Sequence, residues 1–169
     1  MVAETARTTT DWEQQLNARL PLFGHRNWIV VADSAYPSQS KPGIETIVAG
    51  GDQIEAVRKV HQAIGANKHV RANVYLDREL QFIADGDAPG IDEYRKQLGG
   101  ALEGARPDYV LHEEIIRKLD QAALVFRVLI VKTEMTIPYT SVFFELDCGY
   151  WSAEAEQRLR EGMKAAGSA

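Results

Sequence analysis

Two side chains that can exchange protons or bind hydroxyl groups flank one apolar segment. In the stretch "FGHRNWIVVADSAYP", His25 precedes the run "WIVVA" and Asp33 follows it directly. The run at 28–32 is rich in β-branched residues, which predicts a strand buried on both faces. Histidine titrates near neutral pH, and an aspartate accepts hydrogen bonds from hydroxyl groups. The question is whether the two side chains serve one site.

Strand geometry separates His25 from Asp33. A strand rises about 3.3 Å per residue, so an extended chain from His25 to Asp33 spans roughly 25 Å. Either their roles are unrelated, or a second subunit brings its His25 to the strand end where Asp33 lies. Ligands of open α/β sheets gather at the carboxyl ends of strands, so Asp33 stands where a binding residue could lie. The alternatives are an Asx turn or helix cap for Asp33, and a turn or helix-end residue for His25.

Two later segments also carry candidate site residues. His112 opens a predicted helix, whose positive end disfavours imidazolium, so we expect a neutral histidine that accepts hydrogen bonds. In the link "TEMTIPYTS" (133–141), Pro138 fixes the backbone just before Tyr139. A tyrosine and small polar residues on such a link can contact a polyol. The alternatives are a polar helix start without a role and an ordinary connection.

The remaining histidines have simpler interpretations. His61 falls on the apolar stripe of a predicted helix and is expected in packing or at an interface. His69 is expected at the exposed start of a strand. The sequence contains no G-x-G-x-x-G, no P-loop and no H-E-x-x-H, and its one cysteine, Cys148, cannot form a zinc ribbon. We therefore expect no metal and no cofactor.

Hydrophobic periodicity supplies the elements that must position these residues. Strands are predicted at 28–32, 44–50, 69–76, 108–111, 125–133 and 141–150, and helices at 11–23, 52–65, 91–102, 112–123 and 152–167. The stretch 77–90 has no clear pattern. Strands that alternate with helices predict an α/β fold: a single three-layer αβα domain with a mainly parallel sheet.

Length, charge and hydropathy exclude several classes of protein. The chain has 169 residues, enough for one domain with a sizeable core. Its net charge of -5 argues against nucleic acid or an anionic membrane as the main partner. No apolar run approaches the roughly 20 residues of a membrane span, and no secretory signal is visible. A single cysteine allows no intrachain disulfide, and a cytoplasmic location is expected.

The order of these segments resembles the ribose pyranase / fucose mutarotase family (RbsD/FucU). Its members share "GH", an apolar strand, an aspartate eight residues after the histidine and a nearby proline; here these are Gly24-His25, "WIVVA", Asp33 and Pro37. They also share a histidine that opens a late helix, here "HEE" from His112. A last segment, with a Gly-Glu pair and Pro-Tyr-x-Asn between two apolar strands, corresponds to "VLIVKTEMTIPYTSVFFELDCG". The resemblance covers about residues 12–150.

The resemblance implies a cofactor-free isomerase that interconverts the cyclic forms of a monosaccharide. His25 matches the family's catalytic general acid/base, and Asp33 and His112 match substrate-binding residues. Tyr139 and Ser141 match the Tyr-x-Asn substrate contacts. The family forms rings, commonly decamers, with sites between neighbouring subunits. The resemblance thus implies a homo-oligomer in which His25 and Asp33 need not meet within one chain.

The sequence departs from the family pattern near the implied site. Ser141 replaces the asparagine, and Thr133 replaces the glycine before Glu134. The family-like domain is expected at 1–151, with 152–169 as a C-terminal helical extension. Two other functions stay open: a non-catalytic monosaccharide-binding or regulatory protein, and a carbohydrate isomerase or lyase in which Asp33 or Glu134 abstracts a carbon-bound proton.

Overall fold

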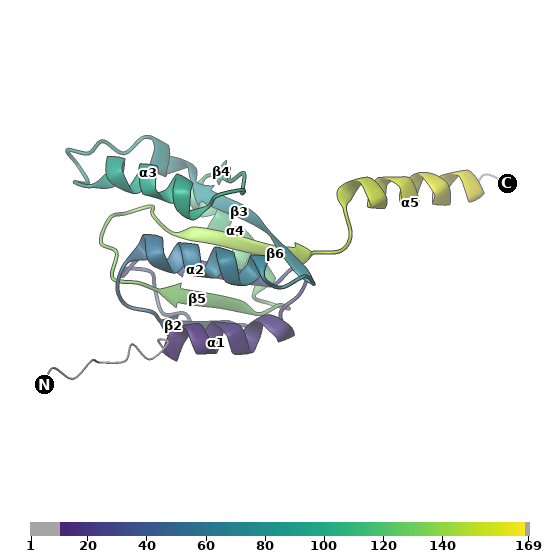
Figure 1. Cartoon of the computed structure of the whole chain (residues 1–169), viewed down its shortest axis with the longest axis horizontal. Helices are drawn as coiled ribbons and strands as arrows, with labels where there is room; N and C mark the ends of the chain where they lie inside the picture. The colour runs from purple at the N-terminus through teal and green to yellow at the C-terminus, as the bar shows by residue number, and fades with distance from the viewer. Residues whose placement is uncertain (1–10, 168–169) are drawn as a thin grey trace, which may run out of the picture.

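A mixed sheet runs through the middle of the molecule (Figure 1). The computed structural model describes residues 11–167. Residues 1–10 of the predicted domain (1–151) and residues 168–169 of the predicted helical extension (152–169) therefore lie outside the described residues. The strands are β1 (Trp28–Ala32), β2 (Ile44–Val48), β3 (Val70–Asp77), β4 (Asp108–Val110), β5 (Val128–Lys132) and β6 (Val142–Cys148). The helices are α1 (Asp11–Arg19), α2 (Gln53–Gly65), α3 (Ile91–Ala101), α4 (His112–Ala122) and α5 (Ala153–Ala166), with 3-10 turns η1 (Leu20–Leu22) and η2 (Arg78–Gln81).

The six strands lie in the order β2-β5-β1-β6-β3-β4. β5 pairs in parallel with both β1 and β2, and β3 pairs in parallel with β4. β6 is antiparallel to both of its neighbours, β1 and β3. The prediction of a mainly parallel sheet is therefore confirmed. The topology adds that β5 and β6, which are consecutive in the sequence, are separated by β1.

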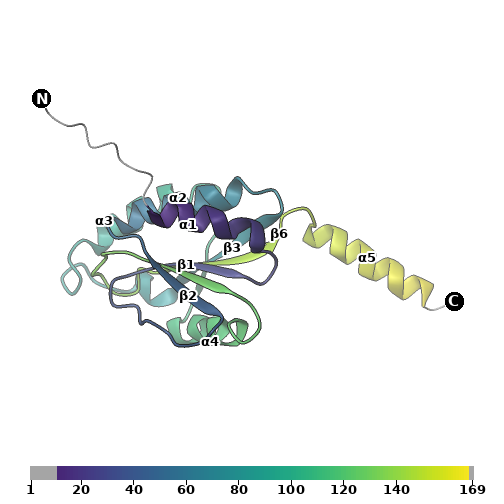
Figure 2. The ribbon, with the colours of Figure 1, turned by 90° about the horizontal axis from the view of Figure 1, so that it is seen from below.

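Helices cover both faces of the sheet, which confirms the three-layer αβα prediction. α1, α2 and α3 lie on one face and α4 on the other (Figure 2). The alternation along β1 shows why "WIVVA" is apolar throughout. Ile29 and Val31 belong to the core under α1–α3, whereas Trp28, Val30 and Ala32 belong to the core under α4. Every residue of β1 is buried, as predicted for a strand covered on both faces.

α5 stands away from the sheet (Figures 1 and 2). Ser152 caps it by accepting a 3.0 Å hydrogen bond from the backbone N–H of Ala155. Trp151 Nε1 donates to Glu156 Oε2 at 2.7 Å, which ties the start of the helix to the preceding turn. None of the helix is buried, although its sequence carries the sparse stripe Leu159 and Met163. The predicted helix is confirmed. Within the described part of the chain, no helix is long and apolar enough to cross a membrane.

Candidate functional site at the carboxyl edge of the sheet

Polar residues at or next to the ends of four strands meet at one edge of the sheet. β1 and β3 run in the same direction, because both are antiparallel to β6. β4 is parallel to β3, so β1, β3 and β4 all end at this edge, while β6 starts there. Asp33 follows β1, Asp77 ends β3, His112 comes two residues after β4, and Ser141 directly precedes β6. The fold thus brings together side chains that are far apart in the sequence.

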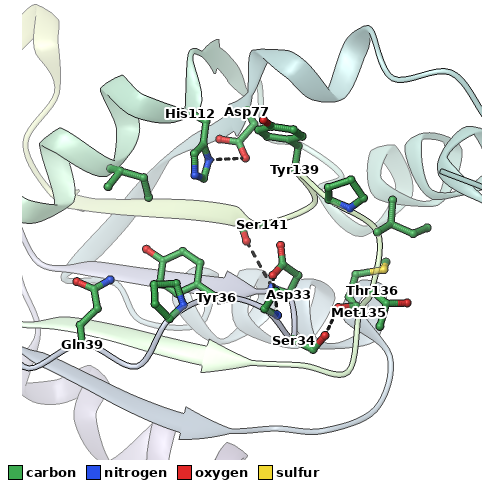
Figure 3. Close-up of a pocket in the computed structure, with 15 residues that line it drawn as sticks. Asp33, Ser34, Tyr36, Gln39, Asp77, His112, Met135, Thr136, Tyr139 and Ser141 are labelled. Atoms are coloured by element: carbon green, nitrogen blue, oxygen red, sulfur yellow. Dashed lines mark hydrogen bonds and ion pairs between the residues drawn. The ribbon is translucent and has the colours of Figure 1, made fainter. Parts of the chain in front are cut away.

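These side chains line a cavity of about 640 Å³, a volume within the usual range for small-molecule sites. Figure 3 shows the cavity with its lining residues. Asp33, His112, Tyr139 and Ser141, which the sequence predicts as substrate-binding residues, all line it. The rest of the wall comes from the loop after β1, from Asp77 and Ile116, and from the link before β6: Ser34, Ala35, Tyr36, Pro37, Gln39, Asp77, Ile116, Met135, Thr136, Ile137 and Pro138.

Asp33 holds the loop after β1 while facing the cavity. Its Oδ1 accepts the backbone N–H of Ala35 at 3.1 Å, which is the Asx turn that the sequence left open as an alternative. Its own backbone N–H lies 3.4 Å from Ser141 Oγ, so the two predicted site residues touch (Figure 3). The turn occupies one carboxylate oxygen, and no hydrogen bond within residues 11–167 engages the second, so it can bind a ligand in the cavity.

His112 forms a hydrogen bond with a carboxylate that sequence reasoning missed. His112 Nδ1 lies 3.0 Å from Oδ2 of Asp77, whose side chain is fully buried. The hydrogen bond to Asp77 raises the pKa of His112, and burial raises the pKa of Asp77. The positive helix end was expected to disfavour imidazolium, whereas the hydrogen bond to Asp77 favours it and so raises the pKa of His112. Glu79 adds a smaller effect in the same direction, because its carboxylate accepts the His112 backbone N–H at 3.1 and 3.2 Å and offsets the positive helix end.

Asp77 escaped the sequence analysis because the predicted strand stopped at residue 76 and the stretch 77–90 showed no clear pattern. The position of Asp77 in the sequence could nevertheless have indicated a site residue. Asp77 directly follows the apolar residue Leu76 near a strand end, as Asp33 follows "WIVVA". Tyr36 was missed as well: it is buried in the loop after β1, and burial raises its pKa to about 12. A loop composition of small polar residues and prolines gave no sign of this buried ring.

Tyr139 lies on a strained stretch of backbone at the cavity. Its φ is 59°, in the left-handed region that residues other than glycine seldom adopt. The ring contacts the His112 ring edge-on, with centroids 5.5 Å apart and an interplanar angle of 87°. Backbone strain of this kind persists only where surrounding structure holds it, and it is found at ligand sites more often than elsewhere. The link before β6 therefore presents Tyr139 to both the cavity and His112.

A buried polar network holds that link in place. Gln53, at the start of α2, is 1% exposed, and its Nε2 donates to the backbone oxygen of Thr140 at 2.8 Å and of Val31 at 3.3 Å. Its Oε1 accepts the hydroxyl of Thr133. Tyr94 on α3 donates its hydroxyl to the same oxygen of Thr140 at 2.5 Å. The network thus fixes the peptide between Tyr139 and Ser141 from two helices.

His25 lies at the opposite edge of the sheet, outside the cavity. It precedes β1, and its Nδ1 is 2.8 Å from Oδ1 of Asp147, near the end of the antiparallel strand β6. Arg71 contacts the other oxygen of Asp147 at 2.8 Å. The His25 side chain is 57% exposed. The structure therefore places His25 apart from the other predicted site residues within one chain, as strand geometry required.

The other two histidines belong to the scaffold. His61 stacks on Phe144 at 6.2 Å and hydrogen-bonds the backbone oxygen of Glu103, which agrees with the packing interpretation. His69 was expected to be exposed and is instead half-buried, because its Nε2 contacts the backbone oxygens of Leu20 and Phe23 that end the first helical segment. Among residues 11–167, no group of three or more His, Cys, Asp or Glu side chains has the arrangement of a metal site.

Comparisons with known proteins place this geometry in a known fold. No family model matches the chain, and no curated protein matches it in sequence. The structure of Bacillus subtilis RbsD complexed with D-ribose aligns with a TM-score of 0.54 and 21% identity, covering 82% of this chain and 93% of that one. The fucose mutarotase of Streptococcus pneumoniae in complex with L-fucose aligns with a TM-score of 0.51 and 20% identity, covering 79% and 91%. The chain therefore has an RbsD/FucU-like fold, as the motifs in its sequence predicted.

Proposed function

We propose that this protein is a sugar mutarotase or pyranase that binds a monosaccharide in the cavity at the carboxyl edge. The observation that supports this most is the convergence of Asp33, His112, Tyr139 and Ser141 in one cavity. Their oxygens and ring nitrogen can accept and donate hydrogen bonds to hydroxyl groups. Apolar side chains such as Ile116 and Ile137 supply the complementary wall for the carbon-bound faces of a sugar ring.

The proposed reaction opens and recloses a cyclic hemiacetal. A base takes the proton of the anomeric hydroxyl, its oxygen–hydrogen electron pair forms the carbonyl, and the bond from the anomeric carbon to the ring oxygen breaks. An acid protonates that ring oxygen as it leaves. Rotation or a change of attacking hydroxyl, followed by the reverse steps, yields the other anomer or ring size. The reaction consumes no electrons and needs two positioned proton carriers.

One carrier in this proposal is His25 of a neighbouring copy. His25 and the cavity occupy opposite edges of the sheet, so one chain cannot bring them together without a large rearrangement. The exposed His25 ring, oriented by Asp147, is suited to reach a second molecule. We therefore propose a homo-oligomer, a decamer as the resemblance to the RbsD/FucU family implies, in which each site combines one chain's cavity with another chain's His25.

A binding protein without catalysis is the second candidate. The observation that favours it is that one chain alone supplies a complete set of hydroxyl-binding groups but not His25. A protein of this kind binds the sugar with the same residues and leaves its rate of anomeric exchange at the uncatalysed level. The third possibility, an isomerase or lyase that removes a carbon-bound proton, requires Asp33 or Glu134 to act as the base.

Exchange NMR on D-ribose, L-fucose and a panel of other monosaccharides separates the three functions. Faster exchange between ring forms at catalytic protein concentration supports the mutarotase. Saturation transfer without faster exchange favours the binding protein. Incorporation of deuterium from heavy water at carbon favours proton abstraction by a carboxylate. If every sugar shows neither binding nor exchange, the proposed function is wrong.

A further inference from the structure

We propose that Asp77 is a positioning residue that makes His112 the second proton carrier of the cavity. This inference deepens the proposed function and rests on it. It assigns to His112 a role beyond the hydroxyl-orienting one implied by the sequence motifs, and it brings in Asp77, which no motif contained.

Among residues 11–167, the carboxylate of Asp77 has His112 as its one hydrogen-bond partner. Its side chain is fully buried, and Oδ2 contacts His112 Nδ1 at 3.0 Å. It does not cap η2, which begins at the next residue, and Glu79 serves the start of α4 instead. Within residues 11–167, Oδ1 of Asp77 has no hydrogen-bond partner. Burying a carboxylate is costly unless a cation or strong donor pairs with it. The pairing with His112 is therefore the feature that accounts for an aspartate at this position.

The pair determines which nitrogen of His112 faces a ligand. With Asp77 at Nδ1, the neutral imidazole carries its proton on Nδ1 and donates it to the carboxylate. Nε2 then has a free lone pair, and the described residues offer it no partner. His112 lines the cavity, and Tyr139 packs edge-on against its ring, so the ring is held by Asp77 on one side and Tyr139 on another (Figure 3).

This arrangement supplies the proton acceptor that ring opening requires. Nε2 of His112 takes the proton of the anomeric hydroxyl, and the resulting imidazolium is stabilised by the Asp77 carboxylate. The carbon–oxygen bond breaks, and the neighbouring copy's His25 gives its proton to the ring oxygen. On reclosure both protons return. Each histidine thus changes its charge once in each direction, and no further reactant is consumed.

Histidine NMR tests the pair without reference to activity. Ring nitrogen shifts of the intact protein, with His112→Gln to assign the signal, are expected to show neutral His112 protonated on Nδ1. In Asp77→Asn the pKa of His112 is expected to fall, because the charge that stabilised imidazolium is gone. Asp92→Asn removes an exposed carboxylate on α3 and should leave His112 unchanged. A neutral ring protonated on Nε2, or a His112 pKa unaffected by Asp77→Asn, overturns the proposal.

Anomeric exchange at saturating sugar tests the role in catalysis. Asp77→Asn is expected to slow exchange about 10²-fold and to shift the rising limb of the pH–rate profile to lower pH, with little change in sugar affinity. If Asp77 acts through His112, adding Asp77→Asn to His112→Gln slows exchange no further. If the two losses multiply, Asp77 has a separate, structural role and the proposal is wrong. If the wild-type protein catalyses no exchange, the proposed function is wrong and His112 is no proton carrier. The NMR shifts still show in that case whether Asp77 and His112 form their hydrogen bond.

Discussion

Burial and partners decide what each carboxylate at the carboxyl edge can do. Asp33 is half-buried, and one of its carboxylate oxygens accepts a hydrogen bond in a local turn, so the other oxygen can bind a ligand. Asp77 is fully buried and contacts His112 instead. Both lie at strand ends on the same edge of the sheet, yet Asp33 is suited to bind hydroxyls and Asp77 to raise the pKa of an imidazole. Residue type and strand position alone do not distinguish these roles.

His25 gives the first prediction at this scale. If it carries a proton, His25→Ala slows anomeric exchange by roughly 10²–10⁴ while sugar affinity changes much less, because the cavity residues remain. His25→Gln should behave like His25→Ala, since an amide forms hydrogen bonds but cannot carry a proton at neutral pH. Exchange NMR measures the rate, and a thermal melt confirms folding. An unchanged rate in the folded variant would remove His25 from the mechanism.

Tyr139 gives a second prediction, on stability. Tyr139→Gly and Tyr139→Ala delete the same ring, which is 39% exposed. Alanine is strained in the left-handed region because of its Cβ, whereas glycine is not, so the glycine variant is expected to be more stable by about 1 kcal/mol. Both variants should bind sugar more weakly than the wild type. Urea unfolding measures the difference; equal stability of the two variants would show that the backbone at this position is not strained.

At the scale of the elements, the sequence pattern predicted individual strands and helices but did not predict which strands pair. The apolar run of β1 and the 3.6-residue period of α2 report directly on burial, so both were predicted at nearly their observed bounds. The Asp77–His112 contact joins residues on β3 and α4, and it depends on β4 pairing beside β3. A single sequence holds no signal for that pairing. For the same reason the separation of β5 and β6 by β1 was not predicted.

Gln53 tests how the scaffold holds the cavity wall. Gln53→Ala removes the buried amide that hydrogen-bonds the backbone oxygens of Val31 and Thr140 and the hydroxyl of Thr133. The free energy of unfolding is expected to fall by about 2 kcal/mol, with weaker sugar binding because the link that carries Tyr139 loosens. The matched control is Gln62→Ala, at an exposed position of the same helix, for which a change within about 0.5 kcal/mol is expected. Equal effects in chemical denaturation would contradict the anchoring role.

For α5 we predict that removal has no effect on the fold or on sugar binding. Because none of its residues is buried, truncation after Trp151 should leave the fold and the cavity unchanged. Sugar affinity is expected to match that of the full chain, and stability to change by less than about 0.5 kcal/mol. Isothermal titration and a thermal melt measure these quantities. A folded but non-binding truncated protein would show that the extension contributes to the site.

At the scale of the whole molecule, the two ends of one strand carry the two halves of the proposed mechanism. His25 lies before β1 and the cavity after it, so the strand itself separates them. Sequence spacing was sufficient to predict this separation, because a strand has a fixed rise per residue. A complete site then requires a second copy. Sedimentation at micromolar concentration is expected to show a large homo-oligomer; a lone monomer would contradict the shared-site proposal.

Mixed oligomers test the shared site most directly. His25→Ala leaves every cavity intact, whereas Asp33→Ala damages the cavity and leaves His25 intact, so each pure variant is expected to be slow in anomeric exchange. Random co-assembly at equal amounts should restore about a quarter of the wild-type rate, because a site is whole when its cavity comes from one variant and its His25 from the other. Exchange that stays at the average of the two pure variants, in mixtures shown to contain both chains, would contradict a site shared between subunits.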